Sequence, residues 1–344
     1  MRIDSFRKAI AKECLKGSAV FQDNLESYLE LLEKMNLGGN FESFKCKFSK
    51  ATDRLLKSAD EFALKQKSKK SVHLIKECFR EVISPFATKG LIVKRGYEKP
   101  RGYPGDYLTL EMIYDLKSLS TDILGRLFDQ YLLEDSYVVA IRNRKEMMKG
   151  LVKKAIIQSS SKKMRILNIA SGGARDIREL FIEDFKLDNL QNVEFVLVDQ
   201  DKAALDFSKQ EIDLIGPSLN VRYVHERIEK VFRKQKQFIS SLGAFDMIYS
   251  IGLIDYIPDL LLGELVKFCF EILNPSGELV LSVKNTKKFR SLASDWFCDW
   301  NFYLREQKDL IRIIDQSLYG RNFKVKPIKG LDDYISFVSV IRKK

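Results

Sequence analysis

The sequence has few of the residues on which disulfide frameworks and zinc sites depend. Its 344 residues include 5 cysteines and 2 histidines. The cysteines are odd in number and never spaced as C-x-x-C, which argues against both kinds of site. We therefore expect reduced, mostly buried cysteines and no metal ion.

Long apolar runs are also missing. No stretch approaches the roughly 20 consecutive apolar residues of a membrane-spanning helix. The first segment, "MRIDSFRKAIAKECLKGSAVF", places charges between its apolar residues, so it lacks the apolar stretch of a signal peptide. Hydrophobic residues make up 45% of the chain and charged residues 31%, as in globular proteins. These features predict a cytoplasmic protein without a membrane span.

Positive charge is abundant and uneven. The formal net charge is +12, and residues 61–101 hold 11 Lys or Arg against 4 Asp or Glu. A basic surface attracts nucleic acid, anionic lipid or acidic small molecules, and a solvated lysine-rich helix face explains the run equally well. Nucleic acid is the least favoured partner, because the chain has no RNA-binding motif and no aromatic platform among its basic residues.

The first part of the chain has helical periodicity. Segments such as "ESYLELLEKM" and "SVHLIKECFREVIS" repeat apolar residues at i, i+3, i+4 and i+7, as amphipathic helices do. This style continues to the polar run "QSSSKK", the best linker candidate. We predict a helical N-terminal cap or substrate domain at residues 1–158 and a second domain at residues 159–344.

The second part alternates short apolar runs with helical segments. The runs "MRILNIA", "VEFVLVD", "FDMIYSI" and "GELVLSV" are typical of buried strands. Strands that alternate with helices predict βαβ units around a parallel sheet with both faces covered. The last runs, "KVKPIKG" and "YISFVSVIRK", predict two further strands joined by a turn.

A loop of small residues follows the first of these strands. It holds Ser171, Gly172 and Gly173, and a helix is expected from about Ala174. Glycines allow a tight turn and close approach to a ligand, and the helix N-terminus presents unpaired N–H groups. The next strand ends at Asp199, whose carboxylate suits ribose hydroxyls. This order predicts an adenosine ligand; the structural alternative is a plain turn with Asp199 capping a helix.

The same loop discriminates between adenosine cofactors. It lacks the third glycine of G-x-G-x-x-G, and the chain lacks the G-x-x-x-x-G-K-[ST] of ATP-binding loops. Asp176 in the first helical turn would repel a pyrophosphate. S-Adenosylmethionine, which carries a cation and a free amino acid end, therefore fits better than NAD.

Several segments together resemble a known family. The order "LNIASGGARD", "LVDQD", "FDMIYSIGLIDYIPD" and "LNPSGELVLSVKN" is similar to class I S-adenosylmethionine-dependent methyltransferases. More narrowly, "EKPRGYPGDYLTLEMIY", "AIRNRKEMM" and "DWNFYLREQKDL" resemble the bacterial methyltransferases assigned to 3-hydroxypalmitic acid methyl ester biosynthesis. The resemblance implies an α/β fold with a Rossmann-like sheet of seven strands, the last pair antiparallel, an N-terminal helical cap, and S-adenosylmethionine as cofactor.

The resemblance also implies where the cofactor binds. Residues 170–173 would lie against its methionine part and Asp199 on its ribose. Residues 226–228 would lie near the adenine and residues 250–256 at the floor of the active site. Asn168 replaces an acidic residue usual in the family. The predicted cofactor-binding residues are Tyr97, Tyr107, Ala170, Ser171, Gly172, Gly173, Asp199, Gln200, Asp201, Arg227, Ile228, Ser250 and Gly252.

Residues 95–115, "RGYEKPRGYPGDYLTLEMIYD", concentrate Pro, Gly and Tyr at the end of the most basic region. A rigid turn between helices would explain them. Because they match the family's most specific motif, we interpret them as part of a lid with a turn at Pro104. Tyr103 and Tyr107 would cover the cofactor or the acceptor. Asp106 would anchor the turn or contact the cofactor's amino group.

Methyl transfer depends on alignment and exclusion of water more than on acid–base groups, and a carboxylate is already ionised at pH 7. Guanidinium groups suit such an acceptor, so Arg101, Arg142 and Arg144 are candidates, with surface ion pairs as the alternative. Tyr256 follows the fourth strand, where open α/β sheets bind ligands. The predicted catalytic residues are Tyr103, Asp106, Arg142, Asn143 and Tyr256.

Three functions stay open. The leading one is a methyltransferase for a small acidic or acyl acceptor, with O-methylation of a carboxylic acid such as a hydroxy fatty acid as the finer expectation. The second is chemistry on S-adenosylmethionine itself, by cyclisation or aminocarboxypropyl transfer with release of methylthioadenosine, because a fold does not fix a function. The third and least favoured is an RNA methyltransferase. The oligomeric state is open, a homodimer included.

Overall fold

The computed structural model describes residues 18–159, 163–184, 190–217, 219–227, 230 and 241–344. Three predicted features lie outside these residues: Cys14, the adenine contact predicted for Ile228, and residues 160–162 of the linker "QSSSKK". In the described part of the chain, no helix is both long and apolar enough to span a membrane. Of the four cysteines described there, Cys46 is exposed and the other three are buried, and all four are free thiols.

The chain divides into two compact units. We call them the helical unit, which runs to Val139 and includes Ser291–Asn301, and the sheet unit, which comprises Ala140–Arg290 and Phe302–Lys344. The division falls inside the continuous helix α8 (Ser136–Gln158), whereas the sequence analysis places it at residue 158.

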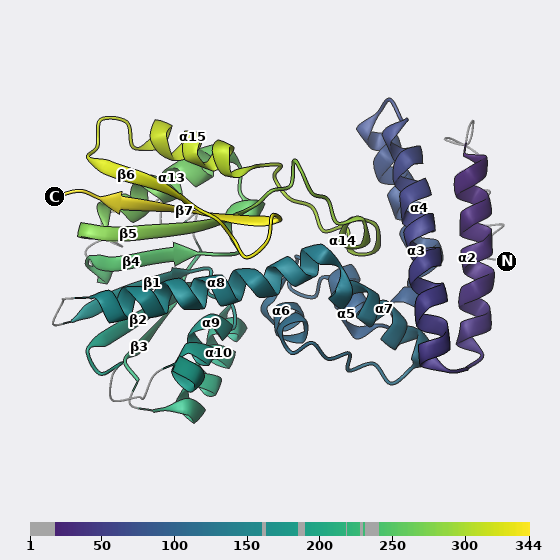
Figure 1. Cartoon of the computed structure of the whole chain (residues 1–344), viewed down its shortest axis with the longest axis horizontal. Coiled ribbons are helices and arrows are strands. Elements are labelled where there is room, and N and C mark those ends of the chain that lie inside the picture. Colours follow the sequence, from purple (N-terminus) through teal and green to yellow (C-terminus); the bar gives the residue numbers. More distant parts are fainter. Residues whose placement is uncertain (1–17, 160–162, 185–189, 218, 228–229, 231–240) are drawn as a thin grey trace. The chain divides into compact units, whose positions relative to one another are not determined.

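The helical unit consists of helices (Figure 1), and these pack around an aromatic core. Trp296 is fully buried, with its ring centroid 5.1 Å from that of Phe79, and Phe128 lies 4.9 Å from Phe48. Such edge-to-face pairs stabilise a core beyond the burial of their area. The helices are α2 (Ala19–Asn36), α3 (Phe41–Leu64), α4 (Lys69–Ala87), α5 (Leu91–Glu98), α6 (Tyr107–Tyr114), α7 (Ile123–Glu134) and α14 (Leu292–Cys298).

The sheet unit contains one seven-stranded sheet. Its order is β3-β2-β1-β4-β5-β7-β6, in which β7 runs antiparallel to β5 and β6 and the other neighbours are parallel. The strands are β1 (Met164–Ile169), β2 (Val193–Asp199), β3 (Val221–His225), β4 (Phe245–Ser250), β5 (Leu273–Lys284), β6 (Phe323–Ile328) and β7 (Ile335–Arg342). This arrangement confirms the predicted Rossmann-like class I methyltransferase sheet with its last pair antiparallel.

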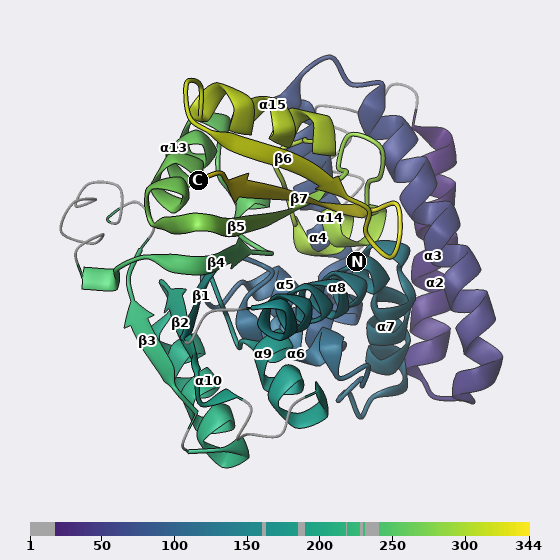
Figure 2. The same ribbon diagram turned by 60° about the vertical axis from the view of Figure 1, so that its left-hand side comes forward.

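Helices cover both faces of the sheet (Figure 2). Because successive side chains of a strand point to opposite faces, Leu167 packs in the core with α13 and α15, and Ile166 in the core with α8, α9 and α10. This double coverage explains why the strands are continuous apolar runs. The remaining elements are α9 (Arg175–Glu179), η1 (Leu180–Asp184), α10 (Lys202–Ile215), η3 (Ile254–Tyr256), α13 (Asp259–Glu271) and α15 (Gln307–Ser317).

Candidate active site

The parallel strands bring their carboxyl ends to one edge of the sheet, and in open α/β sheets ligands bind there. Strand β1 lies between β2 and β4. This edge therefore receives the small-residue loop after β1, the acidic turn after β2 and residues 250–256 after β4. We call it the carboxyl edge.

The loop after β1 has a constrained backbone. Ala170, Gly172 and Ala174 have φ angles of 56°, 53° and 49°, in the left-handed region that favours glycine. Only one of the three is a glycine, and the left-handed conformation of Ala170 and Ala174 was not predicted. Non-glycine residues hold this conformation at a cost and only where the surrounding structure imposes it. The surrounding structure therefore holds the loop in this conformation.

Asp199 at the end of β2 holds this loop. Its Oδ2 accepts a hydrogen bond from the backbone N–H of Gly172 and its Oδ1 one from that of Asp201, both at 2.8 Å. Burial raises the pKa of Asp199, which is 7% exposed. Each carboxylate oxygen has a second acceptor site, so the predicted bonds to ribose hydroxyls fit. Helix capping, the alternative, is done by Asp201, which accepts from Ala203 N at 3.0 Å.

Asp176 at the start of α9 faces a buried hydrogen-bond chain. Its Oδ2 accepts from the Tyr249 hydroxyl at 2.6 Å, and that hydroxyl accepts from the Asn168 amide at 3.0 Å. Burial raises the pKa of Asp176, against hydrogen bonds from Tyr249 and from the backbone N–H groups of Asp176 and Ile177. A carboxylate thus already engages the first N–H groups of α9, which fits the argument against a pyrophosphate ligand.

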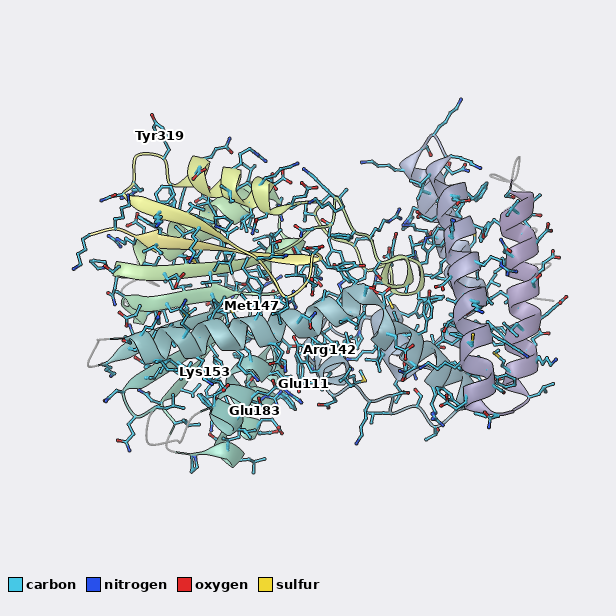
Figure 3. The ribbon with its side chains drawn as sticks, viewed as in Figure 1. Glu111, Arg142, Met147, Lys153, Glu183 and Tyr319 are labelled. Carbon is cyan, nitrogen blue, oxygen red and sulfur yellow. The ribbon has the colours of Figure 1, made fainter. Side chains whose placement is uncertain are left out.

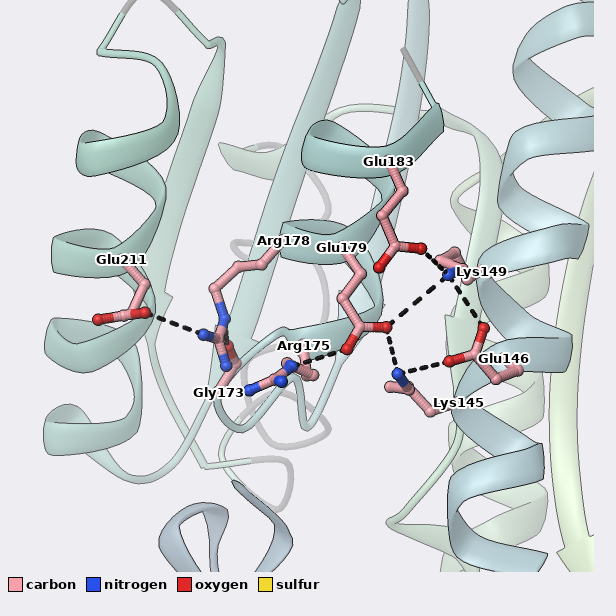
Figure 4. A network of polar contacts seen from close by, with 9 residues as sticks. All are labelled: Lys145, Glu146, Lys149, Gly173, Arg175, Arg178, Glu179, Glu183 and Glu211. Carbon is pink, nitrogen blue, oxygen red and sulfur yellow. Dashed lines mark hydrogen bonds and ion pairs between the residues drawn. The ribbon is translucent and has the colours of Figure 1, made fainter. Parts of the chain in front are cut away.

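Ion pairs fasten α9 on both sides (Figure 4). Glu179 pairs with Lys145 of α8. Arg178 donates to the Gly173 carbonyl at 2.9 Å and pairs with Glu211 of α10 at 3.1 Å. The loop is therefore held from α8 and α10 as well as by Asp199.

Arg305 holds the segment after β4. It is buried, and it donates to the carbonyls of Ile254 and Ile257, the second at 2.6 Å. Its Nε also donates to Asp259 at 2.9 Å. This role of Arg305 was not predicted, because all three partners lie far earlier in the chain.

A cluster of buried charges lies next to this segment. Asp255 and Lys284 are each 2% exposed and Arg144 is 4% exposed. The backbone N–H of Lys284 donates to Asp255 Oδ1 at 3.2 Å. Burial lowers the pKa of Lys284 to about 7, with Asp255 opposing and Arg144 adding to the effect, and burial raises the pKa of Asp255. Of the three, only Arg144 was predicted as a site residue. A lysine at the end of an apolar strand could have indicated that Lys284 is buried.

Aromatic rings surround the lysine of this cluster. The Lys284 Nζ lies 3.8 Å from the ring centroid of Phe302 and 5.9 Å from that of Tyr256. Such distances are typical of cation–π contacts. The structure thus places the predicted catalytic residue Tyr256 beside the buried charges.

Two other predicted catalytic residues lie on α8. Asn143 donates to Asp332 Oδ2 at 2.9 Å, before β7, which gives it a structural role. Arg142, which is labelled in Figure 3, is the second of them. It is half-buried, and burial lowers its pKa. The neighbouring Arg144 is the arginine that faces Asp255 and Lys284.

Residues 95–115 belong to the helical unit. Asp106 is fully buried and accepts from Thr109 N at 3.0 Å and from Arg95 Nε and Nη2 at 2.8 and 2.7 Å. These bonds correspond to the predicted anchoring of the turn. Arg101 lies over the ring of Tyr107, 5.2 Å from its centroid. The contacts predicted between the cofactor or acceptor and this segment stay predictions; they concern Tyr97, Tyr103, Asp106 and Tyr107.

The other predicted cofactor residues differ in exposure. Gln200 and Arg227 are exposed, Ser250 is buried, and Gly252 has open space where a Cβ would stand. The Gln200 carbonyl is hydrogen-bonded to His225 Nε2 at 3.0 Å. The residues predicted beside the adenosine are thus exposed, and the predicted floor includes a buried serine; their contacts with the cofactor stay predictions.

Buried polar atoms that lack a hydrogen-bond partner gather at the carboxyl edge. Folded proteins leave few such atoms. Within the described part of the sheet unit they include Asn168 Oδ1, Ser171 Oγ, Ser250 Oγ, Asp255 Oδ2 and Arg144 Nε.

Residues 42–211 match a family model described as "Putative methyltransferase". The match includes the 95–115 segment, the small-residue loop and Asp199, and the strand order is that of class I methyltransferases. The chain is an S-adenosylmethionine-dependent methyltransferase.

Solved structures are similar to this methyltransferase in fold. A possible exported protein from Bordetella parapertussis aligns at 14% identity with a TM-score of 0.54, over 96% of this chain and 100% of that one. A magnesium protoporphyrin IX methyltransferase from Synechocystis with bound SAM aligns at 10% identity and a TM-score of 0.43, over 61% and 85%. An N-methyltransferase from Bradyrhizobium japonicum aligns at 12% and 0.40, over 59% and 98%. No curated protein matches the sequence.

Proposed function

We propose that the methyltransferase acts on a small acidic acceptor and forms a methyl ester. The observation that carries the proposal is the set of buried polar atoms without hydrogen-bond partners at the carboxyl edge. Ser171 and Ser250 offer hydroxyls to a cofactor, and Arg144 offers a buried guanidinium to an anion.

The cofactor would bind along the loops of this edge. Residues 170–173 would contact its methionine part, and Asp199 would accept from the ribose hydroxyls. Gln200, Asp201 and Arg227 would lie along the adenosine, and residues 250–252 below the methyl group. When bound, the cofactor supplies a methyl group on a positively charged sulfur, which is already a strong electrophile.

Ester formation requires no proton transfer from the protein. The methyl group would pass to a carboxylate oxygen, and the electron pair of the broken S–C bond would stay on the cofactor's sulfur. The protein has to bind, align and exclude water. The two histidines fit this scheme, because both are exposed: His73 pairs with Glu77 at 3.1 Å, and His225 bonds to the Gln200 carbonyl.

A hydroxy fatty acid is the finer candidate for the acceptor. It is favoured by the resemblance of the segments "EKPRGYPGDYLTLEMIY" and "AIRNRKEMM" to the methyl ester family. The residues at the carboxyl edge account only for the acid group of the acceptor. The acyl chain is supported by the resemblance alone.

The test is incubation of the full chain with methyl-labelled S-adenosylmethionine and a cell extract, followed by identification of the nucleoside and the labelled product. We expect S-adenosylhomocysteine and a labelled ester that mild alkali cleaves. A labelled product that resists alkali would overturn the carboxylate acceptor. Methylthioadenosine as the nucleoside would overturn methyl transfer and favour chemistry on the cofactor itself. An Asp199→Ala sample is the control.

A further inference from the structure

We propose that Arg144 and Lys284 form the subsite for the acceptor's carboxylate, and that aromatic rings beside them hold its apolar body. The inference rests on the proposed function and specifies which groups recognise the acceptor. Arg144 is one of the three arginines predicted as candidates for binding a carboxylate acceptor, and no role was predicted for Lys284.

Charge balance in the cluster is the first observation. Three buried cations, Arg144, Lys284 and Arg305, surround the buried Asp255. Arg305 is neutralised by Asp259, which accepts from its Nε and Nη2 at 2.9 and 2.7 Å. Arg144 and Lys284 both act on the carboxyl of Asp255. An anion beside these two buried cations would be attracted by both of them.

The geometry of the polar atoms is the second observation. Arg144 Nε is buried and has no hydrogen-bond partner among the described residues, and the same holds for Asp255 Oδ2. A guanidinium can hold a carboxylate with two parallel bonds. A carboxylate acceptor would thus use a donor that the fold leaves open, whereas an amine would meet two like charges.

Aromatic rings form the third observation. The ring centroids of Tyr256 and Phe302 lie 5.5 Å apart, and those of Phe289 and Tyr334 lie 4.3 Å apart. All four residues are half-buried. The second pair is tied to the end of β5, because Asn285 N donates to the Tyr334 carbonyl at 2.8 Å. Half-buried rings next to a buried charge suit a ligand with an apolar body and an anionic end, such as an acyl or aryl acid.

The subsite predicts a pH dependence of binding. The charged and titratable groups that face Lys284 are Asp255 and Tyr256 of η3 and Arg144 of α8, and Arg305 acts on Asp255. A bound anion favours the protonated amine. In the protein without bound acceptor, the pKa of Lys284 is about 7. The acceptor should therefore bind with proton uptake, and more weakly as the pH rises above 7.

A purely structural role for Lys284 is the competing explanation. Lys284→Met alone would leave Asp255 buried without its lysine and could unfold the protein. Lys284→Met combined with Asp255→Asn removes both charges and keeps similar volumes. Arg144→Met removes the other cation. Lys326→Met, an exposed lysine on β6, is the matched control.

The experiment is calorimetric titration of decanoate into the full chain saturated with S-adenosylhomocysteine, with decylamine and methyl decanoate as charge controls. Of these three compounds, we expect only decanoate to bind, with proton uptake at pH 7.5. Its Kd should rise at least tenfold in Arg144→Met and in the double variant, and stay unchanged in Lys326→Met. S-Adenosylhomocysteine should bind Arg144→Met and Lys326→Met as it binds the wild type, and it should still bind the double variant.

Two results would overturn the subsite. One is a double variant that binds decanoate as the wild type does, without a change in its pH dependence. The other is wild-type protein that binds S-adenosylhomocysteine but not decanoate. A wild type that fails to bind S-adenosylhomocysteine would instead count against the proposed function.

Discussion

Two buried aspartates show how differently the two units use charge. In the helical unit, both oxygens of Asp106 are engaged by Arg95, and one also caps α6. In the sheet unit, Asp255 keeps an oxygen without a hydrogen-bond partner and lies beside Lys284 and Arg144. A fully satisfied network fixes a local structure, whereas an open one is poised for a ligand. We therefore expect changes at Asp106 to act on stability and changes at the carboxyl edge to act on binding.

The largest effect is expected from Asp106→Ala. It should lower the free energy of unfolding of the helical unit by about 3 kcal/mol, because Arg95 loses its carboxylate and α6 loses its N-cap. Tryptophan fluorescence during urea unfolding reports on this unit, since both tryptophans, Trp296 and Trp300, belong to it. Glu33→Ala, an exposed position on α2, is the control. Equal stability of the two variants would show that the bonds of Asp106 do not stabilise the helical unit.

Asp199→Ala should act on the cofactor instead. We expect the Kd for S-adenosylmethionine to rise about 100-fold, because the variant loses both the ribose acceptor and the bond that holds Gly172. Calorimetry measures the change, and Asp206→Ala, exposed on α10, should leave it unaltered. An increase of less than threefold for Asp199→Ala would remove this carboxylate from the cofactor site.

Tyr249→Phe should have a smaller effect on stability. It removes the hydroxyl between Asn168 and the buried Asp176, at a cost of about 2 kcal/mol. Tyr223→Phe is a matched control, because the Tyr223 hydroxyl has no hydrogen-bond partner among the described residues. Chemical denaturation of both variants measures the difference. If the two lose the same stability, the chain through Tyr249 does not support the carboxyl edge.

The smallest effect concerns pH. The pKa of Lys284 is lowered to about 7 in the folded protein, below that of an unfolded lysine, so the unfolded chain holds more protons above pH 7. This group's contribution to the free energy of unfolding should therefore rise with pH above 7, by at most about 1.4 kcal/mol per pH unit. Unfolding between pH 7.5 and 9 should show this rise in the wild type and not in Lys284→Met with Asp255→Asn. Parallel curves would contradict it.

The sequence predicted most of the fold because local patterns determine it. The strands are apolar runs since both faces of the sheet are covered, and the last two strands stand out as a separate pair. Asp199 was found because it ends such a run and follows a recognisable loop. The resemblance supplied the antiparallel pair, which periodicity alone did not.

The rest of the site depends on contacts that the sequence does not display. Nothing local shows that Arg305 reaches carbonyls of the segment after β4, or that Lys284 is buried against Asp255. The left-handed Ala170 and Ala174 were missed because alanine seldom adopts that conformation. Long-range polar contacts and imposed backbone shapes are therefore what the structure adds.

Hydrogen exchange with and without S-adenosylmethionine is the decisive measurement for the carboxyl edge. We expect slower exchange in residues 168–176, 199–201 and 250–256 when the cofactor is bound. Slower exchange in residues 95–115 as well would support the predicted lid. Unchanged exchange throughout the carboxyl edge at saturating cofactor would show that the cofactor does not bind there.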